Sequence, residues 1–131
     1  MNPLMSFLFS MVYLLLDALW LSNMTPVLYR PVFERIQKQS LTFKVGYAAV
    51  AYILLLATMF LICIPLTRAY EHLHPSIVFA MVGLSIYGVY NMTNAAVLGK
   101  YTAATSVVDT AWGTISFAFM GWMWTICSRI S

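Results

Sequence analysis

Residues 45–67 read VGYAAVAYILLLATMFLICIPLT, a run of 23 positions without a charged side chain. At about 1.5 Å rise per residue, a helix of this length crosses a hydrocarbon core roughly 30 Å thick with some tilt. Three further apolar windows lie along the chain, at residues 4–22, 76–98 and 105–127. The sequence therefore predicts an all-α membrane protein, with four transmembrane helices in a compact bundle.

The composition of the whole chain supports a membrane location. Of its 131 residues, 62% are apolar and 8% are charged, whereas about a quarter of the residues in a soluble domain are charged. So few polar residues cannot cover a water-facing surface, and the length suits one domain over residues 1–131. The formal charge of +3 is typical of membrane proteins with basic loops, so no nucleic-acid partner is expected.

The distribution of basic residues predicts an orientation. With four spans, both termini lie on one side of the membrane. The loops at residues 23–44 and 99–104 contain five Lys and Arg residues, whereas the other side has Arg68 and Arg129. By the positive-inside rule, we expect these two loops in the cytoplasm and both termini on the opposite side.

The first loop, residues 23–44, has an amphipathic pattern. Val32, Phe33 and Ile36 recur at helical spacing, with charged residues on the other faces. This pattern predicts a short helix lying in the plane of the lipid headgroups, although an ordinary polar connection fits almost as well. Its contact surface would consist of four basic residues: Arg30, Arg35, Lys38 and Lys44.

Two acidic residues lie inside predicted spans, Asp17 in the first and Asp109 in the fourth. An ionisable side chain at the centre of a membrane helix costs about 2.5 to 3.5 kcal/mol and usually faces the bundle interior. The four-span topology brings both carboxylates to a similar depth near the cytoplasmic face. Each is followed one turn later by a tryptophan, Trp20 or Trp112, on the same helix face. An indole that anchors a helix end at the interface is the simpler interpretation of either pair.

The third predicted span adds a polar stripe near the same face. Tyr87, Tyr90, Asn91 and Asn94 are spaced along one side of this otherwise apolar helix. One interpretation is an interhelical hydrogen-bond network, in which polar side chains satisfy one another. The other is a pocket or proton-accessible cavity formed by this stripe with the two aspartates and tryptophans. We favour the network.

Signatures of catalysis are missing from the sequence. It has no glycine-rich phosphate loop, no nucleophile and base pair and no CxxC motif, so an enzyme is not expected. Glu71, His72 and His74 lie together in the second loop, but without further ligands in view they are a poor metal signature. We expect neither a metal nor a cofactor.

Four motifs along nearly the whole chain point to a known family. They are LDALWL at residues 16–21, LYR at 28–30, YGVYNMTNAA at 87–96 and VDTAWGT at 108–114. With these motifs the chain resembles the small predicted membrane proteins called domain of unknown function 2177. The resemblance implies a four-helix membrane fold and no established activity.

The chain departs from this family pattern in ways that bear on function. The family usually has an aspartate at the position of Asn91 and a basic residue at that of Gly99, so an acid and its basic partner are replaced together. This weakens a role for the acid as a proton carrier. The family has relatives in bacteria and in large DNA viruses, so the resemblance implies an internal virion membrane as one location.

The function expected from the sequence is that of an integral membrane structural or interaction component. Such a protein would anchor a membrane to a larger assembly, for instance a viral capsid, with a protein partner or further copies of itself beside the lipid bilayer. The alternative is a small-molecule or proton-coupled carrier that uses the intramembrane Asp and Asn residues. Four short helices enclose little volume, so a carrier of this size would need to form an oligomer.

Overall fold

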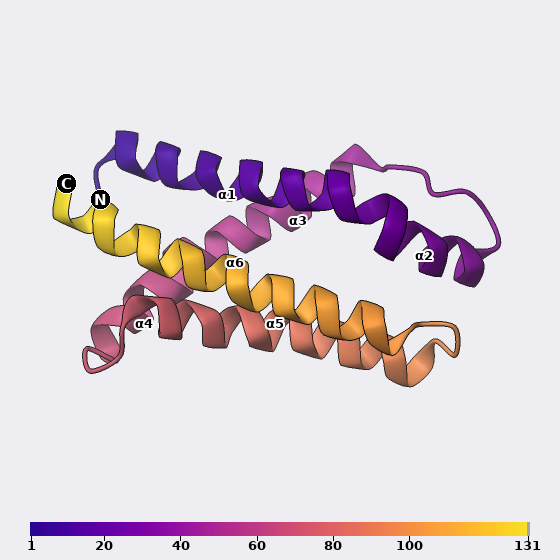
Figure 1. Cartoon of the computed structure of the whole chain (residues 1–131). Coiled ribbons are helices and arrows are strands. Elements are labelled where there is room, and N and C mark those ends of the chain that lie inside the picture. Colours follow the sequence, from indigo (N-terminus) through magenta and orange to yellow (C-terminus); the bar gives the residue numbers. More distant parts are fainter. Residues whose placement is uncertain (131) are drawn as a thin grey trace.

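The computed structural model describes residues 1–130, and these residues form helices and turns without any strand (Figure 1). Four continuous helices follow one another along the chain. The first comprises α1 (Pro3–Met24), the π-helical turn η1 (Thr25–Tyr29) and α2 (Arg30–Gln37). The second comprises α3 (Val45–Thr58), the π-helical turn η2 (Met59–Cys63) and α4 (Ile64–Ala69). The third and fourth are α5 (Pro75–Val97) and α6 (Ala103–Ile130).

The two π-helical turns let the first two helices continue past proline. Pro26 lies in η1, and Pro65 follows η2 by two residues. Proline has no N–H to donate, and its ring collides with the carbonyl four residues back in a regular helix. In η1 the N–H of Arg30 donates to the Thr25 carbonyl, five residues back. The wider turn absorbs the proline, so the helix does not stop there.

The extent of the first loop therefore differs from the prediction. Residues 23–37 are helical, and only residues 38–44 connect the first helix to the second. The expected amphipathic helix is present as α2, but it continues α1 through η1 and is not a separate element. It ends at Lys38, which has a left-handed backbone conformation with φ 56°.

The four helices are antiparallel to their neighbours in sequence (Figure 1). We call the end of the bundle with both chain termini the terminal end, and the end with residues 38–44 and 98–102 the loop end. α6 packs along α5 in the most extensive contact of the bundle, and α1 packs on α6. α3 crosses diagonally behind them, and its helix reaches α5 through η2 and α4.

Close packing of α5 and α6 depends on glycine. A Cβ atom at Gly83 would lie 2.5 Å from the carbonyl oxygen of Gly113, and one at Gly121 would lie 2.5 Å from that of Pro75. A Cβ atom at Gly113 would overlap the ring of Tyr87. Small residues allow membrane helices to approach closely enough for extensive van der Waals contact.

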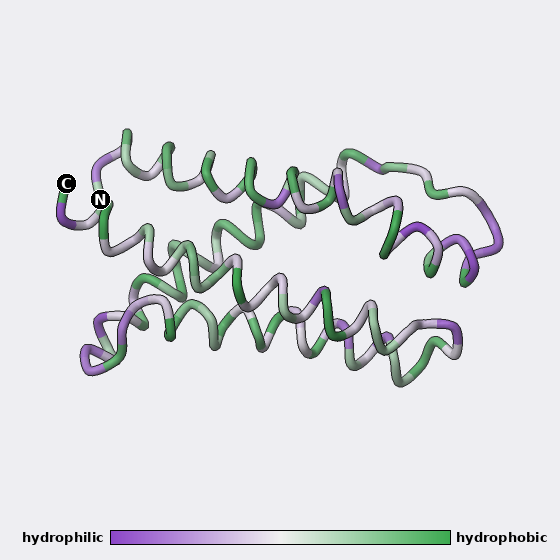
Figure 2. The backbone as a smooth tube through the Cα atoms, viewed as in Figure 1, coloured by the Kyte–Doolittle hydropathy of each residue, from purple (hydrophilic) through white to green (hydrophobic). Residues whose placement is uncertain are grey.

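A buried apolar core fills the terminal end of the bundle, with contributions from all four helices. Its members are Phe9, Tyr13, Met59, Cys63, Ile64, Phe79, Phe117, Met120 and Cys127. Hydrophobic residues prevail along the helices, and most hydrophilic residues gather at the two ends of the bundle (Figure 2). Large apolar side chains such as Phe7, Leu15 and Leu61 are more than half exposed on the outer surface. Such a surface suits contact with lipid.

Three of the four helices are long and apolar enough to cross a membrane: Pro3–Gln37, Val45–Ala69 and Pro75–Val97. The described residues thus confirm the all-helical fold class and contain three candidate membrane spans. α6, the predicted fourth span, is not among them, although it has 28 residues. α6 has a lower hydropathy than the other three helices because polar residues such as Thr105, Ser106 and Ser116 are among its nine buried residues and face protein.

Candidate functional site

Asp17 joins three of the helices at the middle of the bundle. It lies on α1 and is buried, with an exposed fraction of 6%. The indole Nε1 of Trp112 on α6 donates to its Oδ1 at 2.9 Å. The hydroxyl of Tyr52 on α3 donates to its Oδ2 at 2.6 Å. Both carboxylate oxygens therefore accept hydrogen bonds, as a buried carboxylate requires.

Asp109 on α6 is satisfied in a similar way. The hydroxyl of Tyr29 in η1 donates to one carboxylate oxygen, and Asn91 Nδ2 on α5 donates to the other at 2.6 Å. The Tyr29 hydroxyl in turn accepts from the Trp20 indole at 2.9 Å. Asn91 is fully buried, and its Oδ1 accepts from the Tyr101 hydroxyl at 2.6 Å.

The two Asp-x-x-Trp motifs interact reciprocally across the α1–α6 interface. Trp112 of the second motif binds Asp17 of the first directly. Trp20 of the first motif reaches Asp109 of the second through the Tyr29 hydroxyl. The two indoles stack with ring centroids 4.4 Å apart and an interplanar angle of 3°. The motifs thus fix the contact between these antiparallel helices and are not simple interfacial anchors.

The hydrogen-bonded network is complete within the described residues. Among residues 1–130, every buried side-chain nitrogen or oxygen atom has a hydrogen-bond partner. The network extends toward the core, because the hydroxyls of Tyr13 and Tyr87 lie 3.5 Å apart. At the loop end, burial raises the pKa of Tyr101. Tyr101 therefore remains a neutral donor to Asn91 at ordinary pH.

A cavity of about 700 Å³ lies beside the network, between α3 and the other helices. Asp17, Asp109 and both stacked tryptophans line one side of it, and apolar residues line most of the rest. The cavity is partly open. Its lining includes Leu54 on α3 and Ile86 and Tyr90 on α5, which are all exposed on the apolar outer surface. The opening between α3 and α5 therefore faces the region that lipid would occupy.

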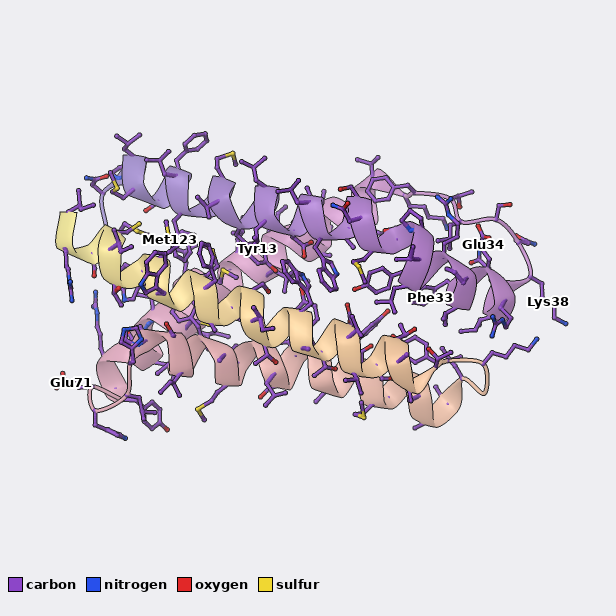
Figure 3. All side chains as sticks on the ribbon, in the orientation of Figure 1. Tyr13, Phe33, Glu34, Lys38, Glu71 and Met123 are labelled. Atoms are coloured by element: carbon purple, nitrogen blue, oxygen red, sulfur yellow. The ribbon has the colours of Figure 1, made fainter. Side chains whose placement is uncertain are left out.

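Most of the predicted cluster residues meet in this site. Asp17, Trp20, Tyr87, Asn91, Asp109 and Trp112 all belong to the network or line the cavity. Tyr90 also lines the cavity but is half exposed, and Asn94 lies further toward the loop end, beside Tyr101. The four basic residues of the predicted contact surface are exposed, with Arg30 3.9 Å from Glu34. Figure 3 shows Glu34 and Lys38 at the loop end, far from Glu71.

Three tyrosines of the network were missed in the sequence. Tyr29 and Tyr52 donate to the two aspartates, and Tyr101 donates to Asn91. Tyr29 stands in the LYR motif of the family resemblance, which was the available signal for its role. Tyr52 is one of three aromatic residues in its apolar span, and no feature of the local sequence distinguishes it.

Comparisons with known proteins bear on the family but not on the activity. The family model described as "Predicted membrane protein (DUF2177)" matches residues 4–126. No curated protein and no solved structure matches the chain. The match covers nearly the whole chain, including both Asp-x-x-Trp motifs and the Asn91 region. The chain therefore belongs to the DUF2177 family of predicted membrane proteins.

Proposed function

We propose that this protein spans the membrane four times and binds a small amphipathic molecule in the cavity beside Asp17 and Asp109, as a membrane carrier does. The observation behind the proposal is the cavity of about 700 Å³, which has the size of small-molecule sites. Both intramembrane carboxylates line it. The opening between α3 and α5 gives access from the lipid.

The burial of α6 supports its role as the fourth span. Its charged residues are Asp109 and Arg129, so residues 110–128 form an uncharged stretch of 19 residues. A helix surrounded by protein on most sides needs fewer apolar residues than one facing lipid. α6 contacts both α1 and α5 and has more buried residues than any other helix. By the positive-inside rule, the loop end lies in the cytoplasm.

The combination of a network and a cavity favours binding over a purely structural role. Hydrogen bonds between membrane helices contribute only about 0.6 kcal/mol each, so the network stabilises the bundle modestly. An open space between helices forgoes van der Waals contacts between them, and a bundle that only anchors a partner would gain such contacts by closing it. Binding explains both the open space and the polar groups on its wall.

The structural component expected from the sequence is the competing function. It would use the exposed basic residues Arg30, Arg35, Lys38 and Lys44 to contact a protein assembly, such as a viral capsid. Under this alternative the Asp and Asn residues only hold the helices together, and the cavity has no ligand other than bulk lipid. The two functions differ in whether binding in the cavity is saturable.

Equilibrium dialysis with the full chain in lipid nanodiscs tests the proposal. The probes are dodecanol, dodecyltrimethylammonium and dodecyl sulfate, and empty nanodiscs correct for partition into lipid. At least one probe is expected to bind saturably, with one equivalent per chain. A lack of saturable binding by all three would overturn the proposed function.

A matched pair of α3 variants locates the binding. Both Ala51 and Ile53 are exposed on α3, but only Ala51 lines the cavity. Ala51→Trp is expected to fill the cavity and abolish saturable binding, and Ile53→Trp is expected to leave it unchanged. Ala48→Trp, also in the lining, serves the same purpose if Ala51→Trp does not fold. Equal loss in Ile53→Trp would place the binding elsewhere.

A further inference from the structure

The cavity has an acidic character without a basic counterpart. Asp17 and Asp109 line it, and its 17 lining residues include no lysine, arginine or histidine. The ion pair found among residues 1–130, between Arg30 and Glu34, does not contribute to the lining, although both residues directly follow lining residues in the chain. Carboxylates in a low-dielectric site attract a positive charge strongly when no basic side chain neutralises them.

The hydrogen-bond directions in the network also favour a positive ligand. Tyr52 and Trp112 both donate to Asp17, and Tyr29 donates to Asp109. The donor hydrogens of these lining residues are therefore directed at the carboxylates. The wall offers a ligand the carboxylate oxygens and the hydroxyls of the two other lining tyrosines, which can donate or accept. An anionic group would meet the negative charge of both carboxylates, whereas a cationic group would meet complementary partners.

Aromatic rings supply the second element of cation recognition. Eight of the 17 lining residues are aromatic, including Trp20, Trp112, Tyr90 and Phe43. Ring faces are negative, so they attract cations, and quaternary ammonium groups are commonly recognised in this way. A fully alkylated ammonium group has no N–H to donate and therefore needs no directed acceptor, because its charge is spread over its alkyl groups. Rings and carboxylates together therefore suit an alkylated ammonium head group.

An apolar groove continues from the cavity toward the terminal end. It has a volume of about 350 Å³ and lies between α4 and α5, lined by residues such as Leu66, Val78 and Met81. Ile86 lines both the cavity and the groove, so the two adjoin. Its lining contains two hydroxyl groups, those of Tyr70 and Ser85. The Ser85 hydroxyl donates to the Met81 carbonyl within α5. The groove thus suits a hydrocarbon chain.

We propose that the ligand is a single-chain cationic amphiphile, whose ammonium head lies in the cavity and whose alkyl chain passes Ile86 into the groove. This inference rests on the proposed function and adds the chemical class of the ligand. Ile86 lines both the cavity and the groove, so an alkyl chain attached to a head group in the cavity would pass Ile86, through the opening between α3 and α5, to reach the groove. A neutral or anionic amphiphile of equal chain length lacks the interaction with Asp17 and Asp109.

The three dodecyl probes separate this inference from the proposed function. Dodecyltrimethylammonium is expected to bind at least about tenfold more tightly than dodecanol, as close charge pairs do in desolvated sites, and dodecyl sulfate is expected not to bind saturably. Equal affinities for the cation and dodecanol would overturn the cationic ligand and leave the proposed function intact. Saturable binding of dodecyl sulfate alone would also overturn it.

Charge-removing variants assign the preference to the aspartates. Asp17→Asn and Asp109→Asn are each expected to weaken dodecyltrimethylammonium binding about tenfold and to change dodecanol binding less than about twofold. Asp17→Glu retains the charge and is expected to keep the preference, which controls for disturbed packing. Glu71→Gln, in the turn at the terminal end, is the control for loss of an acid outside the cavity (Figure 3). A preference that survives in both Asn variants would overturn the assignment.

A groove variant tests the position of the chain. Met81 lines the groove and not the cavity. Met81→Trp is expected to weaken dodecyltrimethylammonium but to leave the short tetramethylammonium ion unaffected. If the long-chain cation binds Met81→Trp as it binds the unaltered protein, the chain does not lie in the groove.

Discussion

At the terminal end of the bundle, apolar side chains from all four helices meet in one packed core, whereas the middle and loop end combine buried polar groups with an open cavity. Phe9, Phe79 and Met120 in the core are fully buried and contact other apolar groups. Asn91 is equally buried, but it is held by hydrogen bonds. Burial alone therefore does not distinguish the half that stabilises the fold from the half that forms the site.

This difference has a physical origin in the bilayer. Lipid tails are as apolar as leucine, so helix association depends on close van der Waals packing and not on removal of apolar surface from water. The core provides such packing. The network contributes less stability per contact but fixes the orientation of each polar group beside the cavity. We therefore expect core variants to change stability and network variants to change binding.

The largest expected effect is at the contact between α5 and α6. Gly83→Ala would place a Cβ atom 2.5 Å from the Gly113 carbonyl oxygen and also against Phe117, so backbone must shift. We expect a loss of about 3 kcal/mol in the free energy of unfolding, the upper part of the usual range for overpacking. Gly88→Ala, whose Cβ would have an ordinary 3.8 Å contact with Thr110, is the control. Unfolding in a denaturing detergent measures both, and equal stabilities would contradict the close packing.

Phe79→Ala breaks the core without touching the site. Phe79 is fully buried at the terminal end. We expect a loss of about 2 kcal/mol, below the value for soluble proteins because the bilayer removes the transfer contribution and leaves the cavity contribution. Binding of dodecyltrimethylammonium should stay unchanged in the folded protein. If the free energy of dodecyltrimethylammonium binding changes by as much as the free energy of unfolding, the core and the site are not independent of each other.

Asn91→Ala removes the central amide of the network. Asp109 would lose one donor and the Tyr101 hydroxyl would lose its acceptor. Leaving buried polar groups unsatisfied is expected to cost about 1.5 kcal/mol. Asn23→Ala, at an exposed amide that donates to the Leu19 carbonyl, should cost far less. Similar unfolding free energies for the two variants would mean that water or lipid replaces the buried bonds.

The smallest effect on stability is expected for Tyr52→Phe. It removes one hydroxyl that donates to Asp17 at 2.6 Å. The loss should be about 0.6 kcal/mol, the average for a hydrogen bond between membrane helices. Since the freed Asp17 oxygen then faces the cavity, the affinity for dodecyltrimethylammonium should change more than the stability does. Tyr47→Phe, at a tyrosine 78% exposed on the same helix, should change neither.

Much of the fold was predictable from the sequence because the bilayer restricts the choices. An uncharged run such as residues 45–67 has to form a helix in lipid, and the antiparallel order then places Asp17 and Asp109 at similar depth. The course of the first helix was not predictable in the same way. Pro26 and Pro31 suggest a break, and only the wider turn η1 carries the helix on to Gln37.

The site was predictable in part, for a similar reason. Helical spacing placed Asp17 beside Trp20 and Asp109 beside Trp112, but not the cross-helix bond from Trp112 to Asp17. Tyr52 lies on α3, and its position depends on the diagonal crossing of that helix (Figure 1). Crossing angles arise from packing between helices far apart in sequence, so neither Tyr52 nor the cavity has a local signal.

The most direct test of the cavity as a binding site is a crystal structure with bound 12-bromododecyltrimethylammonium, whose bromine marks the chain end by anomalous scattering. We expect the ammonium between Asp17 and Asp109, within about 6 Å of an aromatic ring centroid. We expect the bromine in the groove beside Met81. A bundle in which α3 closes against α1 and α5, with the network intact and no ligand inside, would contradict a binding function and favour a structural role.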